Sequence, residues 1–205
     1  MQRTHLFSAL AILTLSSSAA WAVPDGPMPS RNLEETSTDP QAIARTNYNK
    51  GHEAVQSAAK LDLEAASMPA FASQYNETSK ARLRTARENF RKAVEADPEM
   101  KEAWNMLGFT SRKLGDYQES LSAYEKALAL SPNYPEAIEY RAELFLLTGR
   151  LAETKDSYAT LLKMDAAYAA TLKTAMQDFL KADKAFPASV TAQQREEFAR
   201  WVASL

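Results

Sequence analysis

Three glutamates on one stretch of helical sequence are the first candidates for chemistry in this chain. Glu136, Glu139 and Glu143 stand three and four positions apart, a spacing that places them on one face of a helix. Paired carboxyl groups can act as the acid and the base of a hydrolase. Such runs are more often solvated side chains on an exposed face, and we expect that role here.

Few other residues offer catalytic chemistry. The sequence has no cysteine, which excludes disulfides, thiolate metal sites and thiol catalysis. Beyond the N-terminal segment it has a single histidine, His52, and a lone helical histidine is more often a surface or groove residue than a ligand or base. Phosphate-binding glycine loops, metal-binding histidine pairs and nucleophile elbows are also missing. We therefore predict no enzyme activity, no metal site and no cofactor.

The overall composition favours a helical globular protein. Of the 205 residues, 45% are hydrophobic and 24% charged, as in ordinary globular domains. With five glycines and many alanine, leucine and glutamate residues, the chain favours helix over sheet. The formal net charge of −2 and the lack of a long basic run argue against nucleic acid as a partner.

The N-terminus, residues 1–22, has the three-part layout of a secretory signal peptide. A short basic start with Arg3 precedes an apolar run over residues 6–15, and small residues mark a cleavage site after Ala22. The alternative is an uncleaved anchor, but the apolar run is about half of the ~20 residues that span a bilayer. We expect a periplasmic or secreted protein with no stable membrane insertion after cleavage, and a flexible, proline-rich leader over residues 23–39.

The remaining sequence repeats with a period of 34 residues. This shift aligns Phe90 with Tyr124 and Tyr158, and Gly115 with Gly149. A period of this length indicates stacked helical hairpins, each of which needs a neighbour to bury its apolar face.

Caps and breakers divide the repeats into helices. Asp39-Pro40 starts the first helix and Met68-Pro69 stops it, while Asp116 and Thr191 are N-caps of later helices. No segment alternates like a strand, so the fold is predicted to be all-α. The predicted helices cover residues 42–66, 76 or 78 to 96, 99–114, 117–130, 135–147, 151–164, 167–185 and 191–204.

The middle unit resembles the tetratricopeptide repeat (TPR). Its matching residues are Trp104, Leu107, Gly108, Gly115, Tyr117, Tyr124, Ala127, Leu128 and Pro132. The next unit matches more loosely, and the first matches in its second helix. The resemblance implies a right-handed α-solenoid of about three TPR hairpins over residues 40–184. It further implies a C-terminal capping helix over residues 185–205 and small residues where paired helices cross.

The first hairpin departs from the repeat. Residues 51–86 take 35 positions where the equivalent residues 108–120 take 12, so 23 residues are inserted around positions 60–80. We expect a longer first helix and a loop near residues 67–74. Its apolar side chains are predicted either to fold back over the end of the solenoid or to contact a partner; they are Met68, Phe71 and Tyr75.

The last helix has an apolar face suited to cover the other end. Phe198, Trp201 and Val202 form this face. A membrane-surface helix is the alternative, but the strongly basic face that such a helix needs is missing.

By the resemblance, the first helix of each hairpin lines a concave groove that binds a protein or peptide. The groove-facing residues would be Tyr48, His52 and Gln56, then Asn105, Phe109, Arg112 and Lys113, then Glu139, Glu143 and Leu146. For any one of them a generic hydrated face is the competing interpretation. Relatives that grip a C-terminal carboxylate need an asparagine where this chain has Met106, so that specificity is not carried over.

The sequence therefore predicts an extended peptide or a partner's helix bound in this groove, by aromatic packing and matched charges. The alternative is a structural role, in which the repeats self-associate or assemble an envelope or secretion complex. The sequence names neither the partner nor the oligomeric state.

Overall fold

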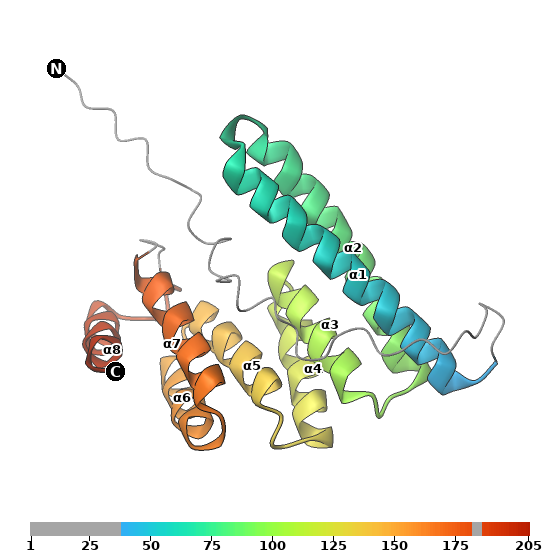
Figure 1. Ribbon diagram of the computed structural model, residues 1–205. Coiled ribbons are helices and arrows are strands. Elements are labelled where there is room, and N and C mark those ends of the chain that lie inside the picture. Colours follow the sequence, from blue (N-terminus) through green and yellow to red (C-terminus); the bar gives the residue numbers. More distant parts are fainter. Residues whose placement is uncertain (1–37, 182–185) are drawn as a thin grey trace.

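The computed structural model describes residues 38–181 and 186–205, which form eight α-helices and one 3-10 turn (Figure 1). No strand occurs in these two ranges, and the all-α prediction is confirmed. The predicted signal peptide and almost all of the predicted leader lie outside the described residues. The elements are α1 (Pro40–Ser67), η1 (Pro69–Phe71), α2 (Ala72–Ala96), α3 (Lys101–Lys113), α4 (Tyr117–Leu130), α5 (Pro135–Leu147), α6 (Leu151–Met164), α7 (Ala166–Lys181) and α8 (Ala192–Ser204).

Side-chain caps start three of the helices where the sequence predicts them. Asp39 accepts a hydrogen bond from the backbone of Gln41, and Asp116 accepts one from the backbone of Glu119, both at 3.2 Å. Thr191 forms a reciprocal capping box with Gln194. Each cap satisfies an amide that the first helical turn leaves without a partner, which explains why these helices begin there.

The hairpins stack so that the first helices follow one another. α3 packs against α5 and α5 against α7, while α4 and α6 form the second layer (Figure 1). We call α3, α5 and α7 the first-helix layer. Trp104 contacts both hydrophobic clusters of the core, one formed by residues from α1 to α5 and the other by residues from α4 to α8. The core is therefore continuous along the stack.

Two glycines allow close packing inside the hairpins, as the resemblance implies. A Cβ added to Gly108 would lie 2.6 Å from the ring of Tyr124, and one added to Gly51 would lie 2.7 Å from the ring of Phe90. Both distances are far below van der Waals contact. In these two hairpins the aromatic residue of the second helix thus lies directly against the backbone of the first helix.

The first hairpin differs from the sequence prediction in two ways. The extra residues lengthen both helices, because α2 begins at Ala72 rather than at residue 76 or 78. The predicted loop near residues 67–74 is only the short connection around η1. This hairpin projects beyond the stack (Figure 1), and the predicted fold-back of its tip is wrong because Met68 and Phe71 are exposed. Leu63 is exposed as well, at 68%.

Helix α8 covers the C-terminal end of the stack, as predicted. Phe198 and Val202 are buried in the second core cluster, and Trp201 meets Tyr158 of α6 edge to face at 5.7 Å between ring centroids. Lys155 lies over the same indole at 5.2 Å. The apolar face of α8 is thus used inside the molecule. Among the described residues, no helix combines the length and the hydrophobicity that crossing a bilayer requires.

Candidate functional site

A charged centre joins α3 to α5 in the first-helix layer. The guanidinium of Arg112 forms an ion pair with the carboxylate of Glu143 and donates from Nε to the hydroxyl of Tyr124 at 3.4 Å. Burial lowers the pKa of Arg112, but Glu143, Tyr124 and Glu139 together raise it by more, so the net shift is upward. Arg112 therefore stays charged although its side chain is 7% exposed.

Two aromatic rings frame this guanidinium. The rings of Phe109 and Tyr140 lie 5.2 Å apart between centroids. The guanidinium carbon of Arg112 is 5.7 Å from the first ring and 5.8 Å from the second. These contacts add cation–π attraction to the ion pair and hold the charge at the junction of two hairpins.

Glu139 is the member of the centre whose environment the sequence did not indicate. We expected the run of glutamates to be solvated, and this is wrong for two of its three members, because Glu139 and Glu136 are 1% and 2% exposed. Burial raises the pKa of Glu139 well above its ordinary value, and the charge of Glu143 raises it further, while Arg112 lowers it. A hydrogen bond joins the carboxyl groups of Glu139 and Glu143, and the raised pKa of Glu139 favours its protonated form.

A second series of hydrogen bonds between polar side chains ends at Glu136, one helical turn before Glu139 on α5. The side-chain amide of Asn105 donates to the hydroxyl of Tyr134 at 3.3 Å, and this hydroxyl donates to Glu136 at 3.0 Å. All three residues are buried. Among the buried acceptor atoms near this series and the charged centre, Oδ1 of Asn105 and Oε1 of Glu139 have no hydrogen-bond partner.

The structure brings five predicted site residues together around α3 and α5. They are Asn105, Phe109, Arg112, Glu139 and Glu143. Most of them are buried, and only Glu143 has substantial exposure, at 23% of its side chain.

The other predicted residues lie elsewhere. Tyr48 and His52 are buried in α1, where Tyr48 packs against Phe90 at 5.7 Å between ring centroids. Gln56 is exposed on α1, and Leu146 is a core residue of α5. Lys113 is half-buried and acts on the carboxyl group of Asp62 in α1, whose pKa is raised by burial and lowered by this charge.

Sequence reasoning missed Tyr134 and Tyr140, which complete the centre. Tyr134 directly precedes the proline that starts α5, and Tyr140 stands where the preceding repeat has Met106. Neither position is one of those whose residue type characterises the repeat. A polar hydroxyl at these two positions is the signal that could have identified them.

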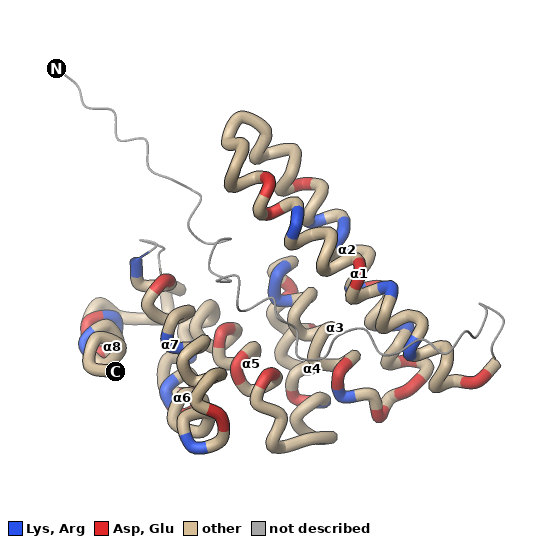
Figure 2. The backbone as a smooth tube through the Cα atoms, viewed as in Figure 1, with Lys and Arg blue, Asp and Glu red and all other residues tan. Residues whose placement is uncertain are grey.

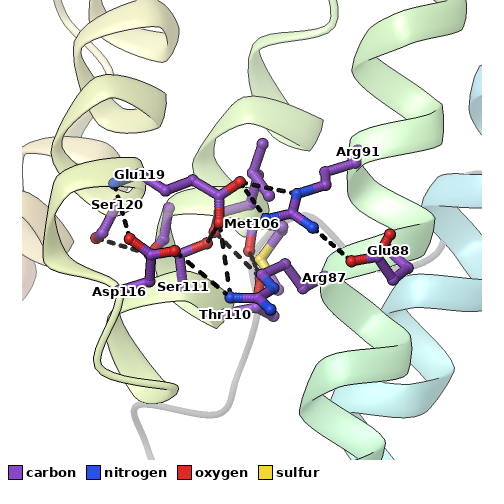
Figure 3. A network of polar contacts seen from close by, with 11 residues as sticks. Arg87, Glu88, Arg91, Met106, Thr110, Ser111, Asp116, Glu119 and Ser120 are labelled. Carbon is purple, nitrogen blue, oxygen red and sulfur yellow. Dashed lines mark hydrogen bonds and ion pairs between the residues drawn. The ribbon is translucent and has the colours of Figure 1, made fainter.

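A separate polar network joins the first hairpin to the second (Figure 3). Glu119 accepts hydrogen bonds from Nε of Arg91 at 2.8 Å and from the hydroxyl of Ser111 at 2.6 Å. Arg87 approaches Asp116 at 3.7 Å and Glu119 at 3.8 Å. Because Glu119 of α4 is held by Arg91 of α2 and Ser111 of α3, we interpret this network as structural.

In the centre between α3 and α5, the carboxyl groups of Glu139 and Glu143 are held by Arg112 or by one another. In the described part of the chain no group of three or more histidine, cysteine, aspartate or glutamate residues is placed to hold a metal ion.

These features define a helical-repeat protein, and comparison with known proteins gives the repeat its name. Residues 101–134 match the tetratricopeptide repeat family. The chain is also 36% identical over 62 residues to "Uncharacterized protein ycf37" of Guillardia theta, an overlap of 30% of this chain and 35% of the relative. The chain thus spans about a third of the length of this relative.

The chain therefore contains a tetratricopeptide repeat, and its helices form an all-α solenoid of TPR type. Repeats of this family form protein-interaction modules that are generally non-enzymatic.

Proposed function

We propose that this chain is a non-enzymatic binding module outside the cytoplasm, which holds an extended peptide or a helix of a protein partner on its first-helix layer and α1. The observation that carries the proposal is the charged centre in that layer. Polar groups from two successive hairpins converge there, and Arg112 and Glu143 join them. A core that served only stability would be expected to be apolar at this position, because burying charges is costly.

Photo-crosslinking with purified protein tests the binding face. Peptides are first selected from a random eight-residue library and then added to variants that carry benzoylphenylalanine at one position. We expect crosslinks from Gln56 of α1 and Lys113 of α3. The control position is Lys126, which is exposed on α4 in the second layer. Crosslinks at Lys126 in place of the other two positions, or failure to select any peptide, would contradict the proposal.

The proposed location rests on the N-terminal sequence. If residues 1–22 direct export, the full-length chain expressed in a bacterium should yield a periplasmic or secreted form that begins at Val23. Mass spectrometry of the purified protein measures this. An intact N-terminus on protein recovered from the cytoplasm would oppose it.

A second candidate function, self-association, is favoured by the tip of the first hairpin. Leu63, Met68 and Phe71 expose 68%, 47% and 57% of their surface there. Exposed apolar groups gathered on a projecting element are typical of contact surfaces. Sedimentation velocity over a range of concentrations should then show dimers that disappear in a Leu63→Ser, Phe71→Ser variant. A wild-type chain that stays monomeric at high concentration would exclude this role.

A further inference from the structure

Two buried oxygen atoms of the first-helix layer lack hydrogen-bond donors. Oδ1 of Asn105 and Oε1 of Glu139 belong to side chains that are 0% and 1% exposed, and neither atom has a partner. The two residues stand 34 positions apart, so they occupy equivalent places in successive hairpins. Nearly all buried polar atoms in proteins are hydrogen-bonded, so two unpaired acceptors in one layer require an explanation.

The charges around these atoms have an excess of one sign. Glu139 and Glu143 are neighbouring carboxyl groups on α5 that face the single guanidinium of Arg112, while Glu136 accepts a hydrogen bond from Tyr134. That guanidinium is already engaged by Glu143 and by Tyr124 of α4. The centre therefore has spare acceptors and lacks donors.

Helices α6 and α7 do not supply a positive charge that offsets the carboxyl groups of α5. On α7 the equivalent position holds Lys173, and no ion pair joins it to Glu139 among the described residues. On α6, Glu153 pairs with Arg150, and Lys155 lies over rings of α8.

We propose that the partner supplies the missing donors as a basic side chain, a lysine ammonium or an arginine guanidinium, which enters the first-helix layer and is held by Glu139, Glu143 and the side-chain oxygen of Asn105. This inference rests on the proposed peptide-binding function and specifies the chemistry of the bound peptide. Both cations carry only donors, which matches a site with spare acceptors.

Binding of this kind has a defined proton balance. In the free protein, burial and the charge of Glu143 raise the pKa of Glu139 and so favour its protonated form, which hydrogen-bonds to Glu143. The incoming cation favours the ionised carboxylate, so Glu139 releases its proton to the buffer and no other bond changes. Affinity should then rise with pH above about 4.5, the ordinary pKa of the side chain, until the raised pKa is passed.

The first test varies only the peptide and so does not depend on the folding of a variant. Selection from the eight-residue library should enrich lysine or arginine at one position. Replacing that arginine by citrulline keeps the shape of the side chain and removes its charge. Titration calorimetry should show binding weakened about 10- to 100-fold, the range for hydrogen bonds to charged groups. Equal affinity of the two peptides would overturn the proposal.

The second test locates the effect on the protein. In a Glu139→Gln variant the arginine and citrulline peptides should bind with similar affinity. The matched control, Glu95→Gln, removes an exposed carboxylate on α2 and should keep the full difference. Calorimetry in buffers of different ionisation enthalpy should report release of about one proton for the wild type and none for Glu139→Gln. Undiminished discrimination in Glu139→Gln would assign the basic side chain to another site.

The outcomes of these experiments distinguish the proposed preference for a basic residue from the proposed peptide binding on which it rests. Peptides that crosslink at Lys113 yet show no preference for a basic residue would uphold the binding face and refute the inference. Failure to select any peptide would refute both.

Discussion

At Glu139 a carboxyl group is held between two helices in a place where its proton is hard to remove. The side chain is 1% exposed, and the charge of Glu143 stands beside it. The favourable charge of Arg112 is directed mainly to Glu143, with which it forms the ion pair. Ionisation of Glu139 therefore sets two carboxylates against one guanidinium inside the protein, and this has a measurable effect on stability.

Glu139→Gln should make the free energy of unfolding less dependent on pH. The folded-state pKa of Glu139 lies above the unfolded value near 4.5, so its stabilising contribution is complete below that pH. The contribution is lost as pH rises through the folded-state pKa. Urea unfolding of the wild type should thus show falling stability across this interval, and the variant should fall less and be the more stable of the two at its upper end. Parallel curves for the two proteins would show that Glu139 ionises at its ordinary pKa.

Gly108→Ala should destabilise the protein. Replacement of an exposed helical glycine by alanine ordinarily raises the free energy of unfolding by about 0.5–1 kcal/mol. Here the added methyl would lie 2.6 Å from the Tyr124 ring, which is fully buried and cannot withdraw. Overpacking of this kind costs about 1–3 kcal/mol. Chemical denaturation measures the difference, and a gain in stability would mean that the two helices separate easily.

At the scale of the elements, local residues determine most helix ends but not what covers each face. The starts at Asp39, Asp116 and Thr191 were predictable because a side chain caps each of them. The start of α2 was not, because its N-cap, Phe71, makes no side-chain bond and gives no local signal.

For the candidate site, too, the local sequence predicts which helix a residue lies on but not what packs against it. The three glutamates lie on one helix, as their spacing predicts, and Arg112 of α3 forms an ion pair with Glu143 of α5. Burial of Glu139 depends on the helices packed around α5, and two of them, α3 and α7, lie more than twenty residues away in the chain. Spacing within one helix contains no information about that contact.

The contribution of α8 as a cap can be measured by removing one anchor. Phe198 is 1% exposed and packs in the second core cluster, so Phe198→Ala should cost about 3–5 kcal/mol of unfolding free energy. Arg200→Ala is the matched control on the same helix, since that side chain is 70% exposed and should change stability by less than about 0.5 kcal/mol. Equal, small effects of the two changes would show that α8 is dispensable.

At the scale of the whole molecule, the hairpins form a line in which each contacts mainly its neighbours. In such a stack the central units have two partners and the end units have one. The outer part of the first hairpin has still less support, because α1 and α2 contact chiefly each other there (Figure 2).

Hydrogen exchange should therefore vary along the chain. We expect the slowest amides in residues 101–147, at the centre of the stack. Amides of residues 60–80 should exchange roughly tenfold faster or more, because that part of the hairpin opens without disturbing the rest. Mass spectrometry of exchanged peptides measures both. Uniform protection along the chain would indicate that the molecule unfolds as one unit.

The projecting hairpin also affects how the molecule tumbles. Helix α1 has 28 residues and is about 42 Å long, whereas α3 has 13 and is about 20 Å long. A rod fixed to one end of a stack meets less drag when it rotates about its own axis than when it turns end over end. Nitrogen relaxation rates should then depend on the direction of each N–H bond, and amides of α1 and α2, which share nearly one axis, should form a group of their own. The relaxation rates of the hairpin amides thus give a reference direction, against which the orientation of the other helices can be determined in solution.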